Sequence, residues 1–218
     1  MRSRVLEARK ASLRLTQQQR ETVVGVLLGD ACLESQNKGQ TYRLKIEQSA
    51  DHETYVRHLR SVFGLWVLSG PRRRTKTART GTPTVSWAFS TVSHGALRFY
   101  AQQFYSLGQK HVPRLIHRWL TPRGLAYWFM DDGSMKSSQS KAVIFNTQGF
   151  ERPDVERLIG VLSSQFQLAA KLRRQRDGFQ IFVSGTSYER FRELVDPFVI
   201  ADMRYKLPRP RRTPMPKE

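Results

Sequence analysis

Cysteine is almost missing from this chain of 218 residues, with Cys32 as its single example. One thiol excludes a disulfide framework and a thiolate metal site, and the apolar–polar alternation around Cys32 predicts a buried strand residue. Apolar runs are short, and none approaches the roughly 20 residues that a membrane-spanning helix needs. The five histidines share no common spacing, which gives no support to a histidine–metal nuclease motif.

Acidic residues are also scarce. Aspartate and glutamate number 18 against 37 lysines and arginines, a formal net charge of +19. A small protein needs a net charge of only about 2–8 for solubility, so this surplus indicates a polyanionic partner. A membrane surface is the alternative, but no basic amphipathic helix with a wide apolar face is present. We therefore expect nucleic acid and no membrane.

Two apolar stretches, residues 23–31 and 125–133, each end in small residues and an aspartate. Thr16 with Gln19 forms a capping-box pattern before the first stretch, and Thr121-Pro122 is a helix start before the second. Gly133 suits the left-handed position that closes a helix. An Asp-Asp-Gly sequence is often nothing more than a solvated turn. Here, however, an apolar stretch ends in an aspartate twice, at Asp30 and again about half a chain later at Asp132, and this repetition favours a functional role.

The first stretch carries Gly25 and Gly29 at a spacing that lets two helices approach closely. Side by side, the two helices would bring Asp30 and Asp132 together at one end. Carboxylates that converge repel each other unless a cation lies between them, and hard oxygen ligands suit Mg²⁺. Negative charge at the end of a helix also calls for a positive partner beyond it.

The two stretches resemble the nine-residue motif of the LAGLIDADG homing endonucleases, and most closely the single-chain, two-repeat type of the mitochondrial omega intron. The resemblance extends over residues 23–208 and includes residues 66–69 and 205–208. It implies that Asp30 and Asp132 bind metal, with Mg²⁺ as cofactor and Mn²⁺ as a substitute. The first copy ends Gly-Asp-Ala in place of Ala-Asp-Gly, which leaves the number of metal ions open.

Hydrophobic periodicity predicts helix, hairpin, helix, hairpin and helix in each half. We expect hairpins over residues 31–48, over 66–69 with 84–90, and over 167–183, a strand over 142–148, and helices over 52–63 and 153–166 and after the caps Ser93 and Ser187. The resemblance implies an α+β fold of two pseudo-symmetric αββαββα repeats, with a central packed helix pair and two antiparallel four-stranded saddle sheets. We expect a basic N-terminal extension over 1–15, repeats over 16–120 and 121–208, and a basic proline-rich tail over 209–218.

One face of each sheet must cover helices, which leaves the other face to solvent or to a ligand. A basic two-stranded ribbon fits the major groove of DNA, although a solvated sheet face is the alternative. The residues that we expect to bind DNA are Arg43, Lys45, Arg72, Arg73, Arg74, Lys76, Arg79, Arg173, Arg174 and Arg176, and the group from Arg72 to Arg79 is assigned to the connection of the second hairpin.

Lys110 and Lys206 follow the final helix of their repeats at matching places. A single lysine is usually a solvated surface group, but the resemblance implies that lysines at these positions lie in the cleavage centres. Their role would be to polarise water or to stabilise charge on phosphate. Gln48 and Gln148 are expected at the ends of equivalent strands, where they would orient water.

The resemblance implies a monomeric endonuclease that binds a long asymmetric DNA duplex and cuts both strands to leave short 3′ overhangs. The partner within a dimer is already present in the duplicated chain. An organelle is the expected compartment, because the basic N-terminus is compatible with a transit peptide, although Glu7 argues against one. The alternative function is an RNA-binding intron maturase on the same scaffold. A transcription regulator lacks support, because no recognition-helix arrangement is visible.

Overall fold

A computed structural model describes residues 2–77 and 83–208, so the expected DNA contact Arg79 and the tail over 209–218 lie outside the described residues. The α-helices are α1 (Arg2–Ser12), α2 (Gln17–Leu28), α3 (Glu53–Phe63), α4 (Arg98–Phe104), α5 (Pro122–Asp132), α6 (Arg152–Phe166) and α7 (Tyr188–Val195). The strands are β1 (Cys32–Glu34), β2 (Arg43–Ser49), β3 (Arg72–Thr77), β4 (Pro83–Ser90), β5 (Tyr105–Ser106), β6 (Gln109–Lys110), β7 (Gly133–Met135), β8 (Val143–Phe145), β9 (Ala170–Gln175) and β10 (Gly178–Val183).

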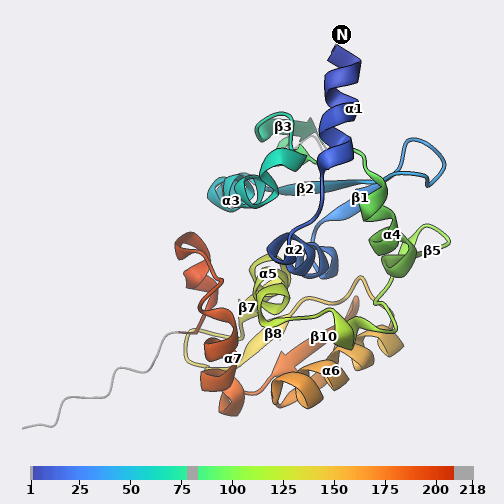
Figure 1. The fold of residues 1–218 in the computed structure, drawn as a ribbon. Coiled ribbons are helices and arrows are strands. Elements are labelled where there is room, and N and C mark those ends of the chain that lie inside the picture. Colours follow the sequence, from blue (N-terminus) through green and yellow to red (C-terminus); the bar gives the residue numbers. More distant parts are fainter. Residues whose placement is uncertain (1, 78–82, 209–218) are drawn as a thin grey trace, which may run out of the picture.

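Helices α2 and α5 pack against each other at the centre of the molecule (Figure 1). Their starts are the expected ones: Thr16 and Gln19 form a capping box, and the Thr121 side chain accepts a hydrogen bond from the Gly124 N–H. Glycine makes the close approach possible, because a Cβ atom on Gly25 would lie 2.3 Å from the carbonyl oxygen of Gly124. Both helices are buried almost all round, so they form the core and not a surface layer.

Two antiparallel four-stranded sheets lie on either side of this pair, in the orders β1-β2-β4-β3 and β7-β8-β10-β9. Helix α3 covers β2 and β4 in the first sheet, and α6 covers β9 and β10 in the second. Figure 1 shows the first sheet above the central helices and the second below them. The fold class is as expected, with two sheets of the same order around one helix pair. Within the described residues, no helix is long and apolar enough to cross a membrane.

Several local expectations are wrong. Residues 66–69 do not form a strand, since Trp66 ends a 3-10 turn and the edge strand is Arg72–Thr77. Gly133 is not left-handed (φ −82°), because the chain passes directly from α5 into β7. Gly133 is nevertheless required, since a Cβ atom there would lie 2.0 Å from the Phe129 ring. The expected cap Ser93 is replaced by His94, whose side chain accepts from the Ala96 N–H.

Further differences concern single residues and short segments. Cys32 is only half-buried, although it lies in a strand as expected. Ser187 directly precedes α7, but its side chain does not cap that helix. Its hydroxyl instead accepts a hydrogen bond from the Ala169 N–H at 2.8 Å. The strand expected over 142–148 is only Val143–Phe145. Helix α1 and the β5–β6 hairpin were not anticipated.

Candidate catalytic centre and nucleic-acid interface

Asp30 and Asp132 lie at the shared end of the central helix pair, directly after α2 and on the last turn of α5. Asp30 is exposed and Asp132 is half-buried. Burial and then the charge of Asp30 raise the pKa of Asp132 to about 7, while the charges of Lys110 and Lys206 oppose this shift. The two aspartates are therefore close enough to interact electrostatically across the boundary of the two repeats, as the duplicated motif predicts.

Asp131 holds the two helix ends together. One of its carboxylate oxygens accepts the backbone N–H of Asp30 at 3.2 Å, and the other accepts Nε2 of Gln48 at 3.1 Å. Gly29 leaves the space for this side chain, because a Cβ atom on Gly29 would lie 2.4 Å from the Cβ atom of Asp131. Burial, followed by the charges of Asp30 and Asp132, raises the pKa of Asp131 well above its ordinary range. The Tyr55 hydroxyl lies beside this carboxyl but reaches no hydrogen bond of standard geometry.

Gln48 links both carboxylates. Its buried amide nitrogen donates to Asp30 Oδ2 at 2.9 Å as well as to Asp131. Its amide oxygen lies 3.4 Å from Nδ1 of His52, and Nε2 of the same ring lies 3.0 Å from the Tyr205 hydroxyl. This chain of polar contacts fixes the Gln48 amide and connects the first repeat to the last turns of the second. The structure thus brings Gln48 to the aspartates, as expected.

Each lysine lies over the carbonyl end of one central helix. Lys110 donates to the carbonyl oxygens of Gly29 at 2.6 Å and Ala31 at 2.9 Å. Lys206 donates in the same way to Met130 and to Asp131, the latter at 2.9 Å. Burial lowers the pKa of both ammonium groups, and the surrounding aspartates oppose this shift. These are the positive partners that the helix dipoles and the carboxylates require.

The donor set fits a metal that keeps water and substrate oxygens as ligands. Within residues 2–77 and 83–208, no group of three or more His, Cys, Asp or Glu residues is arranged as a metal cage. Mg²⁺ is usually held by one or two carboxylates together with phosphate oxygens and waters. Asp30 and Asp132 supply such a pair. The pKa of Asp132 is raised first by burial and then by the charge of Asp30, and a bound cation would oppose both effects.

Gln148 does not take the place expected for it, since β8 ends at Phe145 and Gln148 lies in the following turn. The sheet registers show which residue corresponds to Gln48. Cys32 pairs with Lys45 in the first sheet, and Ser134, the equivalent residue after the second motif, pairs with Ile144. Counting three residues onward gives Gln48 in one repeat and Thr147 in the other. The Thr147 hydroxyl donates to the carbonyl oxygen of Phe179 at 2.7 Å, and not to an aspartate as Gln48 does.

The outer face of the first sheet is a network of ion pairs, because two glutamates stand among its basic side chains. Glu34 contacts Arg43 at 2.8 Å and Lys45 at 3.2 Å. Glu47 contacts Lys76 at 2.7 Å and lies 3.7–3.9 Å from Lys45 and Arg74. These contacts hold long side chains in fixed positions, and the pKa of Glu47 is lowered chiefly by its hydrogen bond with Lys76.

Strand register divides the expected DNA contacts between the two faces of the sheets. Arg72 pairs with Ala88 and Arg74 with Ser86 on the outer face, whereas Arg73 pairs with Trp87 on the face toward α3. In the second sheet, Arg173 faces outward opposite Gln180, and Arg174 lies opposite Phe179 on the helix side. Arg176 is in the exposed turn before β10. Arg73 and Arg174 therefore lie on the edge strands β3 and β9, with their side chains on the helix side and not on the outer faces.

Two basic residues of the second outer face were missed. Lys136 and Lys171 lie 5.7 Å and 5.2 Å from the ring centre of Phe182, on the same face as Arg173. The alternation Lys171-Leu172-Arg173 is visible in the sequence and could have identified Lys171 once the hairpin register was set. Lys136 follows the short strand β7, which no sequence signal indicated.

Comparison with known proteins agrees with this architecture. The LAGLIDADG DNA endonuclease family matches residues 20–191. "Probable intron-encoded endonuclease 1" of Wickerhamomyces canadensis is 31% identical over 198 residues, covering 88% of this chain and 85% of that protein. "DNA endonuclease I-ChuI" of Chlamydomonas applanata is 31% identical over 210 residues, covering 88% and 95%. The structure of the homing endonuclease I-WcaI bound to its DNA recognition sequence superposes with a TM-score of 0.87 at 29% identity, covering 93% and 91%. The chain belongs to the LAGLIDADG DNA endonuclease family.

Proposed function

We propose that this protein is a monomeric, site-specific endonuclease that binds a long asymmetric DNA duplex and hydrolyses one phosphodiester in each strand, leaving short 3′ overhangs. The observation that supports this most strongly is the meeting of Asp30 and Asp132 between two basic sheet faces, with one lysine over each helix end. A protein that only bound nucleic acid would need the basic faces but not the converging carboxylates. The repeats are proposed over residues 16–120 and 121–208.

Asp30 and Asp132 would hold Mg²⁺, with Mn²⁺ as a substitute. When bound there, the metal would activate a water for attack and stabilise the leaving oxygen. Lys110 and Lys206 donate to main-chain carbonyls, which fix the position of each ammonium group. Each would stabilise negative charge on a phosphate from that position. Gln48 would position the Asp30 carboxylate and nearby water, while Gln148 is left without a role.

The outer sheet faces would follow the two halves of the duplex. Arg43, Lys45, Arg72, Arg74 and Lys76 would contact one half. Lys136, Lys171 and Arg173 would contact the other, with Arg176 at the turn. The duplication within one chain supports a monomer, because the second half of the pseudo-dimer is already present. An organelle is the proposed compartment.

The function is tested by selection for cleavage. A randomised duplex library is incubated with the protein in Mg²⁺, and cut ends are captured and sequenced. We expect a single long asymmetric consensus with staggered cuts. Asp132→Asn in Mg²⁺ and wild type in Ca²⁺ serve as controls that should bind without cutting. An RNA-binding maturase would enrich no cleaved DNA, and this outcome would overturn the proposal.

The extended interface is tested by salt. Neutralising each phosphate releases a counterion, so duplex affinity should fall steeply as salt rises. A slope of log K against log salt that is shallower than about −3 would contradict an interface spanning both sheets. The measurement uses catalytically silent Ca²⁺ conditions, so that binding is read without cleavage.

A further inference from the structure

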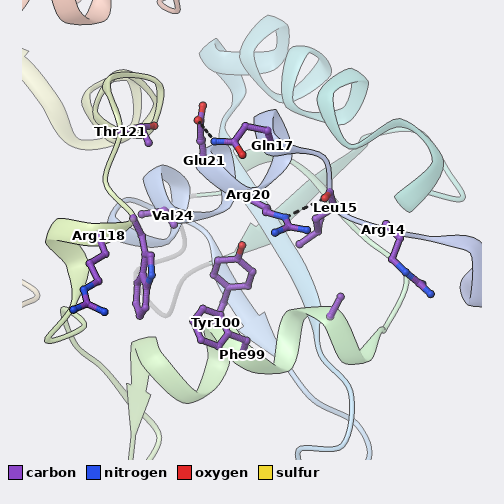
Figure 2. A pocket seen from close by; sticks show the side chains of 12 residues that line it. Arg14, Leu15, Gln17, Arg20, Glu21, Val24, Phe99, Tyr100, Arg118 and Thr121 are labelled. Carbon is purple, nitrogen blue, oxygen red and sulfur yellow. Dashed lines mark hydrogen bonds between the residues drawn. The ribbon is translucent and has the colours of Figure 1, made fainter.

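A cavity lies at the end of the central helices that is opposite the aspartates. Its volume is about 450 Å³, and it is lined from the starts of α2 and α5 and from α4 (Figure 2). The cavity is lined by α2 from Gln17 to Val24, so roughly 9 to 20 Å of helix separates its lining from Asp30. A duplex on the outer sheet faces, beside the catalytic centre, would leave this cavity open.

The floor of the cavity is aromatic. Phe99 contacts Trp119 edge to face, with ring centres 5.2 Å apart, and it contacts Tyr100 in the same way at 5.4 Å. Phe99 is a large apolar side chain with 47% of its surface exposed, and Trp119 is half-buried. An exposed ring edge beside a second ring offers an apolar surface on which a flat ligand can stack.

Tyr100 adds an unused polar group. Its side chain is only 8% exposed, and its hydroxyl forms no hydrogen bond to any protein group in the described part of the chain. Figure 2 shows this hydroxyl pointing away from α4, toward the α2 side of the cavity. The hydroxyl lines the cavity and is accessible from it, so it is available to form a hydrogen bond with a ligand atom there.

The rim is positively charged. Arg14, Arg20 and Arg118 line the cavity, all three are exposed, and none pairs with a carboxylate among the described residues. Glu21 is the single acidic residue of the lining, and Arg123 neutralises it at 3.1 Å. Arg14 and Arg20 each donate to backbone carbonyl oxygens of the preceding residues, which leaves their positive charge without a carboxylate partner among the described residues. The cavity therefore combines rings at its base with guanidinium charge at its edge, which suits a ligand with a flat ring and a nearby anion.

We propose that this cavity binds one nucleotide of a single-stranded nucleic acid, with its base on the Phe99 and Trp119 rings and its phosphates on Arg20 and Arg118. Rings interleaved with arginine are the usual means of binding unpaired strands. A base within a duplex cannot present its face to the cavity, so this site is selective for unpaired strands. The protein could then hold a single strand on one side and a duplex on the other.

The test uses full-length protein and a fluorescein-labelled oligouridylate of about twelve nucleotides, with fluorescence anisotropy as the readout. An excess of unlabelled random-sequence duplex in Ca²⁺ occupies the sheet faces. The double variant Arg20→Ala/Arg118→Ala should lose about tenfold in affinity for the strand, and Phe99→Ala and Tyr100→Phe should each lose a few-fold. The matched control Arg4→Ala/Arg98→Ala removes the same charge from exposed positions outside the cavity and should change little.

Duplex affinity and cleavage of plasmid DNA should remain unchanged in all these variants, which separates this proposal from the endonuclease function. A matching oligothymidylate identifies whether RNA or DNA is preferred, and binding of either supports the site. Equal losses for strand and duplex, or no loss, would overturn it. So would efficient competition by a glutamate–tyrosine copolymer, because this would assign the cavity to an acidic peptide.

Discussion

The two repeats share a scaffold but differ in how their basic side chains are held. In the first sheet, Glu34 and Glu47 join Arg43, Lys45, Arg74 and Lys76 into one network of ion pairs. In the second sheet, Lys136, Lys171 and Arg173 have no carboxylate partner among the described residues, and the two lysines flank the Phe182 ring. Side chains that are fixed before binding favour specific contacts with bases, whereas free cations favour contacts with any phosphate. We therefore predict that the first half contributes more to discrimination and the second more to affinity.

The two halves of the candidate catalytic centre also share their main groups and differ in local structure. The aspartates and the lysines have equivalents in both repeats, but the local structure that delivers each lysine differs. Lys110 comes from the β5–β6 hairpin, while Lys206 ends a 3-10 helix over Ala201–Lys206. Gln48 reaches the carboxylates, and its register equivalent Thr147 does not. Duplication has preserved the charged groups and allowed the polar groups around them to diverge.

The largest effect is expected where the repeats are equivalent. Asp30→Asn and Asp132→Asn should each lower double-strand cleavage by on the order of 10³-fold, because each removes a proposed metal ligand on which charge stabilisation would depend. Duplex binding should persist. Asp131→Asn should have a smaller effect, since the Asp131 carboxylate is already engaged by the Asp30 backbone N–H and by Gln48. The assay is linearisation of a supercoiled target plasmid in Mg²⁺, with a gel shift in Ca²⁺. Full linearisation by Asp132→Asn would refute the assigned centre.

The contact between the two central helices gives the next largest effect, on the stability of the fold. Substitutions at its two glycines should differ in their cost. Gly25→Ala should destabilise the fold by roughly 3 kcal/mol, because its Cβ atom would meet the Gly124 backbone, which cannot move aside. Gly124→Ala should be milder, since its nearest neighbours lie at 3.2–3.3 Å. Gly160→Ala on the exposed side of α6 is the control and should stabilise by about 0.5–1 kcal/mol. Urea denaturation measures all three, and equal effects of Gly25→Ala and Gly124→Ala would contradict the asymmetric contact.

Replacing Gln48 should affect the two strands unequally, because the second repeat, within its described residues, has no equivalent amide at the carboxylates. Gln48→Ala releases the Asp30 carboxylate and is expected to slow cutting of one strand by about tenfold more than the other, so that nicked plasmid accumulates. The Mg²⁺ concentration for half-maximal rate should also rise, which a general loss of stability would not cause. Thr147→Val removes the equivalent polar group and serves as the control, with both strands cut at equal rates. Equal slowing of both strands by Gln48→Ala would show that the amide serves the whole centre.

Much of this architecture could be predicted from sequence, because it depends on local signals. Caps at Thr16 and Thr121, glycines at helical spacing and two repeated aspartates are short patterns with direct physical meaning. The positions of Lys110 and Lys206 followed from the duplication and the family resemblance. What failed depends on register and on long-range pairing: β3 consists wholly of exposed residues and carries no apolar alternation, and Gln148 is one residue away from the position that strand pairing assigns. The Glu47 network joins β2, β3 and β4, so no single stretch of sequence could indicate it.

The smallest expected effect tests the charge network itself. Glu47→Gln should release Lys45, Arg74 and Lys76 from their shared carboxylate, which adds one positive charge to the outer face of the first sheet. Affinity for random duplex should rise a few-fold, and the slope of log K against log salt should steepen by about 0.9. Discrimination between target and random DNA should fall, because the freed side chains lose their fixed geometry. Glu189→Gln breaks a comparable pair with Lys141 outside the sheet face and is the matched control. If Glu47→Gln instead raises affinity for the target and for random DNA equally, the network adds only charge, and the two sheets are alike in how they bind.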